Sequence, residues 1–126
     1  MMQKHKMLKS YQMAEREAAA ESGDAHMLVA TLIDELLRRM NRYADSFETE
    51  SSEKRSEHFA RSLTILHSLQ DCLDFENGGE IAVNLFRLYE YSRQQLLMSL
   101  KSKDVSGVRS SVGFLSEINE AWKQIG

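Results

Sequence analysis

The sequence repeats an apolar spacing that fits a helix, in a chain that contains no proline. Between residues 24 and 47 the apolar positions recur every three or four residues, at Val29, Ile33, Leu36, Met40, Tyr43 and Phe47. This spacing places the side chains on one face of an α-helix. Because none of the 126 residues is proline, no helix is interrupted by a residue without an amide hydrogen. The pattern predicts a first helix that begins at Asp24, a residue type favoured at the N-cap.

Three further stretches have a similar periodicity and predict three more helices. A polar connection at about 48–54 separates the first two, and the later helices are expected at about 52–74, 80–102 and 104–125. Asp104 is the predicted N-cap of the last one. Apolar arcs on the second and third helices are too wide to face a single neighbour, which is typical of helices inside a bundle.

The clearest break in the chain is Asn77-Gly78-Gly79. Glycine adopts positive φ without a steric penalty, so the pair predicts a tight reversal in which at least one glycine has φ > 0. Glu80 would then lie in the first turn of the third helix, where the positive end of the helix dipole favours a carboxylate. These residues are interpreted as structural.

Together, the segments predict an all-α fold: an antiparallel up-down four-helix bundle formed by residues 24–126. Residues 1–23 are more polar, and we expect them to form a short helical or extended segment that docks on the bundle or is partly disordered. A monomer is expected. The alternative is an intermolecular coiled coil, such as a dimer, because the first apolar stripe is heptad-like.

The sequence has no residues that support an enzymatic or metal-binding reading. None of the four histidines has a glutamate three residues before it, so the Glu-x-x-His pairs of di-iron bundles are absent. Phosphate-binding glycine motifs and nucleophile elbows are also missing. The only cysteine, Cys72, lies in an apolar row and is expected to be buried and inert, while His26 is expected to face solvent. We therefore expect no enzyme, no metal and no cofactor.

Charge and hydropathy exclude two classes of partner. A formal net charge of −3 gives no general attraction to phosphate backbones, so nucleic-acid binding is not expected. The longest stretches without a charged residue are nine residues long, whereas a membrane-spanning helix needs about 18 or more apolar residues. The sequence predicts a soluble protein without stable membrane insertion.

Aromatic and apolar residues of the third helix exceed what one core face can hold. Tyr89 and Tyr91 point about 200° apart on a helix, so one of them should lie near the surface. Leu96, Leu97 and Leu100 add to this apolar excess. Two readings stay open: an unremarkable apolar surface, or a groove for an amphipathic helix of a partner. Trp122 is interpreted as a core plug at the end of the bundle.

Residues 73–91 read LDFENGGEIAVNLFRLYEY, which resembles the LDxExGGEIAxNLxxLYDYM signature of the flagellar secretion chaperone family (FliS). The closing segment EINEAWKQI at 117–125 also resembles that family. So do Ser10-Tyr11-Gln12 and the block that contains Leu32 and Ile33. The resemblance spans most of the chain.

The resemblance implies a small four-helix bundle of the bacterial cytoplasm. Such a chaperone binds the disordered C-terminal region of flagellin, prevents its premature polymerisation and helps to deliver it to the flagellar type III export gate. Client-binding candidates that follow are Tyr11, Leu32, Ile33, Tyr89, Tyr91, Leu96, Leu97 and Leu100, with Gly78, Gly79, Glu80 and Trp122 as structural residues.

The chain also departs from the family pattern. Asp24-Ala25 stands where the family has Ser-Pro, and Glu35-Leu36 replaces a pair of small residues. Added bulk at that pair can change a groove on the first helix, which bears on the identity of the client. The alternatives are a divergent paralogue that chaperones another filament protein and a self-associating structural bundle.

The N-terminal segment carries a thin apolar stripe at Met7, Tyr11 and Ala14. A tethered segment competes at a high effective concentration, so one expectation is that residues 1–23 act as a lid over the client groove. The other is a frayed tail without a role, because chain ends are often poorly ordered.

Overall fold

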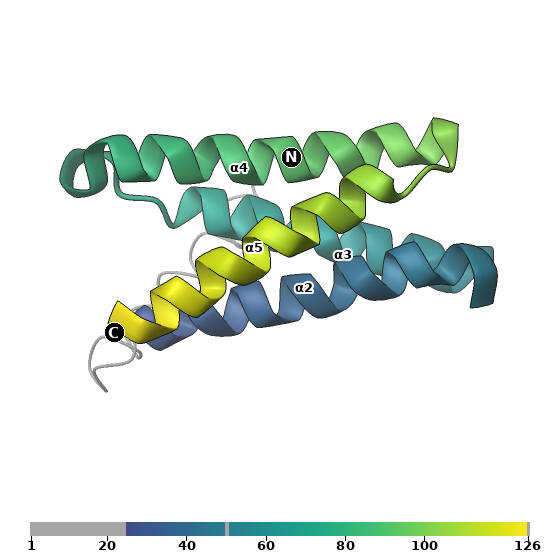
Figure 1. Cartoon of the computed structure of the whole chain (residues 1–126), viewed down its shortest axis with the longest axis horizontal. Helices are drawn as coiled ribbons and strands as arrows, with labels where there is room; N and C mark the ends of the chain where they lie inside the picture. Colours follow the sequence, from purple (N-terminus) through teal and green to yellow (C-terminus); the bar gives the residue numbers. More distant parts are fainter. Residues whose placement is uncertain (1–24, 50, 126) are drawn as a thin grey trace, which may run out of the picture.

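The computed structural model describes residues 25–49 and 51–125, and these residues form four α-helices without a strand. In chain order the helices are α2 (Ala25–Thr49), α3 (Ser52–Asp71), α4 (Phe75–Ser102) and α5 (Ser106–Ile125) (Figure 1). The prediction of an all-α four-helix bundle is confirmed. Asp24, the predicted cap of the first helix, and the segment 1–23 lie outside the described residues.

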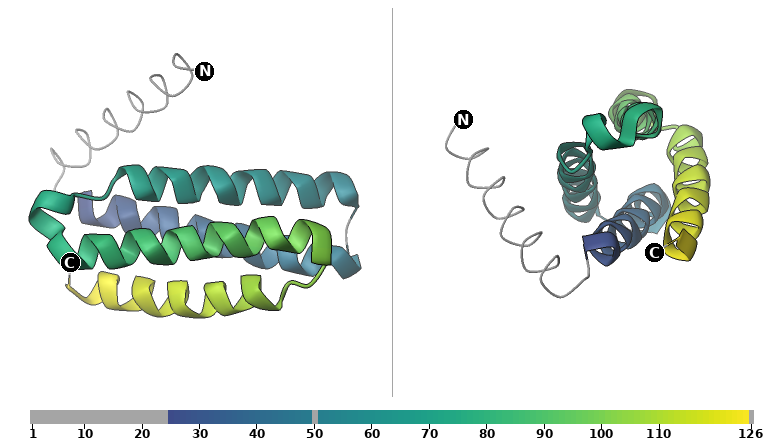
Figure 2. Two further views of the ribbon diagram at one scale, coloured as in Figure 1. Left: turned by 90° about the horizontal axis from the view of Figure 1, so that it is seen from above. Right: turned by 90° about the vertical axis from the view of Figure 1, so that its left-hand side faces the viewer.

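The helices run alternately up and down, and they surround the core in the order of the chain. Helix α2 packs against α3 and α5, and α4 packs against the same two helices. The end-on view shows α4 diagonally opposite α2 (Figure 2). Two residues connect α2 to α3, so the connection is shorter than the polar stretch suggested. Ser51 caps α3 by accepting a hydrogen bond from the amide of Lys54 at 3.3 Å.

The connection between α3 and α4 differs from the sequence-based expectation. Helix α3 ends at Asp71, three residues early, because Asp74 caps the next helix instead of extending the last one. The Asp74 carboxylate accepts hydrogen bonds from the amides of Glu76 and Asn77, both at 3.1 Å. These bonds lower the pKa of Asp74, and the backbone bond from Asn77 is the largest cause. The third helix therefore begins at Phe75 rather than at Glu80.

The double glycine makes a kink inside α4 instead of ending a loop. Gly79 has φ 52° and ψ −128°, so the prediction of a positive φ is confirmed. Gly78 is constrained by space, because a Cβ there would come within 2.9 Å of the Ala82 side chain. The first helical turn of α4 thus runs at an angle to the rest of the helix, and Glu80 is exposed just after the kink.

At the other end of α4, Lys103 adopts the left-handed conformation with φ 59°, and its amide donates to the carbonyl of Ser99 at 2.9 Å. Asp104 was predicted to cap the last helix. Its carboxylate accepts from the amide of Ser106 at 2.9 Å, and helix α5 begins at that residue. This backbone bond is also the main reason that the pKa of Asp104 is lowered.

The core is centred on α2. Ile33, Leu36, Met40 and Tyr43 have at most 1% of their surface exposed. They pack against apolar side chains of the other three helices, chiefly Leu66, Leu69, Leu96, Val108 and Leu115. Full burial of such a side chain stabilises the folded state by about 1.5–3 kcal/mol. The apolar stripe of α2, from Val29 to Phe47, therefore supplies the centre of the core.

Serine hydroxyls are buried along the same core, at Ser46, Ser62, Ser92, Ser99 and Ser111. Each donates a hydrogen bond to a carbonyl three or four residues back in its own helix. One of them also reaches across the bundle, because Ser99 Oγ lies 2.5 Å from the hydroxyl of Tyr43. This buried bond links the diagonal pair of helices, α2 and α4.

Polar contacts on the surface hold α2 to α5. Asp34 Oδ1 accepts from Asn119 Nδ2 at 2.6 Å and from Lys123 Nζ at 3.1 Å. Arg109 pairs with Asp45 at 2.9 Å nearer the other end. Within the described ranges, none of the helices combines the length and apolar character needed to cross a membrane.

Candidate functional site: an apolar pocket at one end of the bundle

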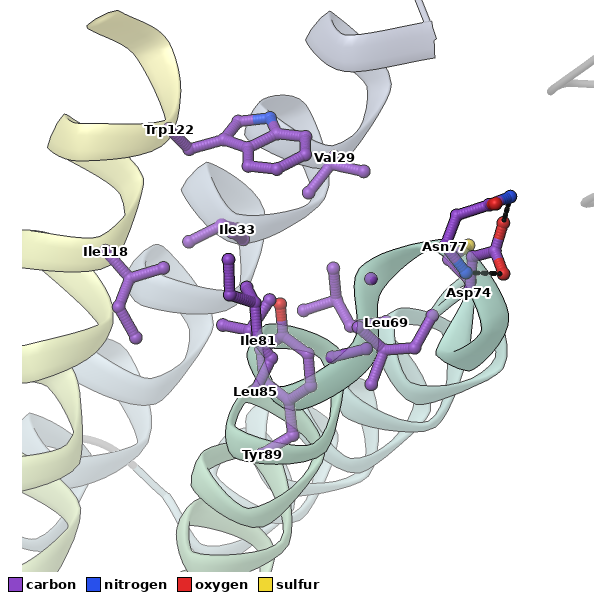
Figure 3. A pocket seen from close by; sticks show the side chains of 14 residues that line it. Val29, Ile33, Leu69, Asp74, Asn77, Ile81, Leu85, Tyr89, Ile118 and Trp122 are labelled. Atoms are coloured by element: carbon purple, nitrogen blue, oxygen red, sulfur yellow. Dashed lines mark hydrogen bonds between the residues drawn. The ribbon is translucent and has the colours of Figure 1, made fainter. Parts of the chain in front are cut away.

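An apolar pocket of about 340 Å³ opens at the end of the bundle where α2 and α4 begin and α3 and α5 end. Side chains from all four helices point into it (Figure 3). Its main lining residues are Val29 and Ile33 from α2, Leu69 from α3, Ile81, Leu85 and Tyr89 from α4, and Ile118 and Trp122 from α5. We refer to this feature below as the end pocket.

The kinked start of α4 forms one edge of the end pocket. Asp74, Asn77 and Gly78 line this edge, and the Asn77 amide group donates to Asp74 Oδ2 at 2.7 Å in addition to the capping bonds. The dashed bonds in Figure 3 show that these polar groups satisfy one another. The edge is consequently held in place without taking hydrogen bonds from the pocket interior.

Trp122 lines the opposite wall and is held there by His26. The ring of Trp122 stacks on that of His26, with centroids 4.1 Å apart and planes 6° apart. The Trp122 indole N–H donates to the carbonyl of His26 at 2.8 Å, and the His26 ring bonds to the carbonyl of Trp122. Both side chains are half-buried. The expectation of a solvent-facing histidine is wrong, because the Trp122 ring covers one face of His26. Trp122, which was interpreted as a core plug, is half-buried and lines the pocket.

Tyr89 brings a single hydroxyl into this apolar space. The residue is 2% exposed, and its hydroxyl points into the end pocket (Figure 3). Burial is the main reason that the pKa of Tyr89 is raised to about 12, with Cys72 a second cause. No described residue hydrogen-bonds to this hydroxyl. It can therefore donate to, or accept from, a group that enters the pocket.

The surface around the end pocket is unusually apolar. Nine large apolar side chains are exposed in the described part of the chain, and six of them lie at this end: Met27, Phe75, Ile81, Val83, Phe86 and Ile125. Ile81 is 72% exposed, although it also lines the pocket. The rings of Phe75 and Phe86 meet at 6.0 Å beside the kink. Large apolar side chains exposed together at one end of a molecule are candidates for contact with another protein.

The comparisons with known proteins agree with one another. The sequence model of the family described as "Flagellar protein FliS" matches residues 7–126. The flagellar secretion chaperone FliS of Salmonella typhimurium is 34% identical over 94% of this chain and 88% of its own length. FliSB of Pseudomonas aeruginosa, also a flagellar secretion chaperone, is 31% identical over 95% of both chains. This chain belongs to the FliS family. The resemblance inferred from the sequence is thereby confirmed.

In this FliS chain, the structure brings together part of the set of residues expected to bind a client. Ile33 and Tyr89 line the end pocket, and so do Gly78 and Trp122, which were expected to have structural roles. Leu32 is half-buried beside the core. Tyr11 lies outside the described residues.

The remaining candidates lie farther along α4. Tyr91 is 43% exposed and packs against Phe114 at 5.7 Å, so the prediction that one tyrosine of the pair lies near the surface is confirmed. Leu96 is fully buried in the core, Leu97 is half-buried, and Leu100 is 52% exposed near the opposite end of the bundle. None of these four residues lines the end pocket.

Several pocket residues escaped the sequence analysis. Ile81 and Leu85 fit a core row, and their spacing alone gives no sign that the row ends in an opening. The available signal was the pair of glycines directly before Ile81, since a kink there separates the start of α4 from its neighbours. Cys72 was expected to be buried, but it is half-buried at the pocket wall. Among the described residues, no group of three or more His, Cys, Asp or Glu is arranged to hold a metal ion.

Proposed function

We propose that this FliS chain is an export chaperone that binds the disordered C-terminal region of flagellin, prevents its premature polymerisation and delivers it to the flagellar type III export gate. The observation that carries the proposal is the end pocket with its rim of exposed apolar side chains. A disordered segment rich in apolar residues can place side chains in the pocket and cover the rim with its backbone.

The energetics fit a complex that must form and later release its client. Each apolar side chain that moves from water into the pocket contributes about 1.5–3 kcal/mol. Ordering the flexible segment costs about 2–5 kcal/mol or more of the interaction energy. A large contact can therefore give only a moderate net affinity, which suits a chaperone that gives up its client at a membrane gate.

Binding is tested by measuring flagellin affinity calorimetrically, with and without the flagellin C-terminal segment. An Ile81→Asp substitution places a charge at the pocket mouth, where the side chain is exposed, so the bundle remains folded and affinity falls by at least tenfold. Ser110→Asp, on an exposed position of α5 away from the pocket, is the matched control. Undiminished binding by the Ile81 variant, or by flagellin that lacks its C-terminus, would contradict the proposal. Binding only to another filament protein would favour the paralogue reading.

The hydroxyl of Tyr89 gives the end pocket a directional contact. We propose that it hydrogen-bonds to a polar or backbone group of the client that enters among the apolar side chains. Removal of the hydroxyl in Tyr89→Phe leaves the shape of the ring unchanged and breaks no hydrogen bond within the described structure. Affinity for flagellin should fall several-fold, with no loss of thermal stability. Equal affinity would show that the hydroxyl contacts nothing in the complex.

We also propose that residues 1–23 regulate access to the end pocket, with Tyr11 as the main contact. The proposal rests on the apolar stripe of that segment and on its attachment at the start of α2, which lines the pocket. Deletion of residues 1–12 should leave the helical signal intact, increase the binding of a hydrophobic dye and raise the affinity for flagellin. Unaltered affinity and dye binding would contradict the lid, and lower affinity would identify Tyr11 as a direct contact.

A further inference from the structure

A second cavity, of about 380 Å³, lies at the opposite end of the bundle. It is lined by the end of α2, the start of α3 and the end of α4, through Tyr43, Phe47, Arg55, Phe59, Leu100 and Lys103 together with two serines. Ile33 of the end pocket and Phe47 of this cavity are 14 residues apart on α2, which corresponds to about 21 Å at 1.5 Å per residue. The two cavities are therefore separate sites.

The floor of this second cavity is aromatic. Tyr43 packs edge-on against Phe47, with ring centroids 5.3 Å apart, and at a tilt against Phe59, with ring centroids 5.5 Å apart. Leu100 adds an aliphatic side chain that is 52% exposed. An apolar side chain of a partner can therefore be desolvated here, as in the end pocket.

Charge distinguishes the second cavity from the end pocket. Its lining includes two cations, Arg55 and Lys103, and no carboxylate. The guanidinium of Arg55 lies over the ring of Phe47, 4.5 Å from the centroid. Neither cation forms an ion pair with an acidic side chain in residues 25–49 or 51–125. Both positive charges are thus available to a ligand.

A second observation concerns a buried donor of Arg55, one of the residues that line the cavity. The Nε–H of Arg55 is buried and has no hydrogen-bond partner among the described residues. A buried donor without an acceptor is unfavourable, because it has lost water and gained nothing in exchange. A carboxylate that enters the cavity would supply that acceptor, and hydrogen bonds between a guanidinium and a carboxylate are among the strong ones in proteins.

We propose that this second cavity binds an acidic, apolar peptide segment of a protein partner, with an apolar side chain on the aromatic floor and a flanking carboxylate on Arg55 and Lys103. The site is independent of the flagellin-binding end pocket. It would give the chaperone a contact for a second protein while its client occupies the other end of the bundle.

The test uses three synthetic peptides that differ only in charge. Acetyl-Glu-Leu-Phe-Glu-amide is the acidic probe, and its twins carry Gln or Lys in place of both Glu residues. Binding to the full chain is followed by NMR through the aromatic resonances of Tyr43, Phe47 and Phe59. The acidic probe should bind at least fivefold more tightly than the Gln twin, and the Lys twin should bind most weakly. The preference should shrink at high salt.

Lys103→Asn is the principal variant, because asparagine tolerates the left-handed conformation that Lys103 adopts and so removes the charge without disturbing the helix end. This substitution should lower the affinity for the acidic probe at least threefold. It should also reduce the ratio of that affinity to the affinity for the Gln twin. Lys101→Asn, on an exposed position of the same helix end that does not line the cavity, matches it in net charge and should retain the preference. Arg55→Gln should act like Lys103→Asn, and the lysine variant suffices if the arginine variant fails to fold.

Three results would overturn the proposal. The first is equal affinity for the acidic and Gln probes, and the second is an unchanged preference in Lys103→Asn. The third is a concentration-dependent dimer that blocks the probes, since a second copy of the chain would then be the occupant. Flagellin binding, measured on the same variants, should not change, so failure here is distinguishable from failure of the end-pocket proposal.

Discussion

Helices α2 and α4 are the two longest of the bundle and lie diagonally across from each other, but they differ in how they use apolar residues. In the described part of the chain, α2 buries six apolar side chains and exposes one large one, Met27. Helix α4 buries three and exposes seven. Helix α2 therefore holds the fold together, whereas much of the apolar surface of α4 is available to other molecules.

The contrast between α2 and α4 should be greatest in the free energy of unfolding. Leu36 of α2 is fully buried, so Leu36→Ala should lower the free energy of unfolding by about 2–5 kcal/mol. Met98 of α4 is 60% exposed, and Met98→Ala should leave it unchanged within about 0.5 kcal/mol. Urea denaturation of the two variants measures both values. Similar losses would show that α4 is as essential to the core as α2.

A substitution of Trp122 shows whether this wall residue of the end pocket stabilises the fold, contacts the client or does both. Because the side chain is half-buried, Trp122→Ala should cost roughly half of the 3–5 kcal/mol typical of a fully buried aromatic residue. It should also release the stacked ring of His26. Thermal unfolding gives the stability, and flagellin affinity measured well below the transition gives the binding contribution. Intact binding by the folded variant would assign Trp122 to the core alone.

The kink near the start of α4 can be tested by comparing alanine substitutions of Gly79 and Gly113. Gly79→Ala should lower the free energy of unfolding by about 1 kcal/mol or more, because its positive φ is unfavourable for a residue with a Cβ. Gly113 lies in α5 with open space around it, so Gly113→Ala should raise the free energy by about 0.5–1 kcal/mol. Opposite signs in chemical denaturation would confirm the kink, and a stabilising Gly79→Ala would contradict it.

The smallest effect concerns the acid stability of α4. Hydrogen bonds from Arg93 are the main reason that the pKa of Glu90 falls to about 2. The folded state therefore holds this carboxylate ionised more strongly than the unfolded chain does. The resulting stability is present above the unfolded pKa of about 4.3 and is lost as the pH falls towards 2. Glu90→Gln should flatten that part of the stability profile, and an identical slope would exclude the contribution.

Much of the fold could be predicted from the sequence, because helix periodicity and capping are local. The α2 stripe predicted the core face, and the double glycine predicted a positive φ. Asp74 was harder, since its side chain could either continue α3 or cap α4, and only the hydrogen bonds to the amides of Glu76 and Asn77 decide. The buried serines were also not predicted. Each hydroxyl bonds to a carbonyl of its own helix and needs no partner elsewhere. The sequence pattern therefore does not distinguish these buried serines from exposed ones.

The candidate site was less predictable than the fold, because a pocket depends on where four helices stop packing. Ile33 was selected from the block that resembles the family and Tyr89 from the apolar excess of the third helix, and both line the end pocket. Leu96 was selected from the same apolar excess and lies in the core. Periodicity places a residue on a face of its helix. It cannot tell whether the neighbouring helix is close enough to cover that face.

The bond between Tyr43 and Ser99 has a consequence for alignment. Apolar contacts are non-directional, so they define the register of two helices less sharply than a hydrogen bond does. A shift of α4 by one turn, about 5.4 Å, would separate the two buried hydroxyls and leave Tyr43 without its partner. The bond therefore fixes the alignment of α2 and α4 along their axes. Tyr89 lies ten residues before Ser99 on α4, so the same bond keeps Tyr89 beside the residues of α2 that line its pocket.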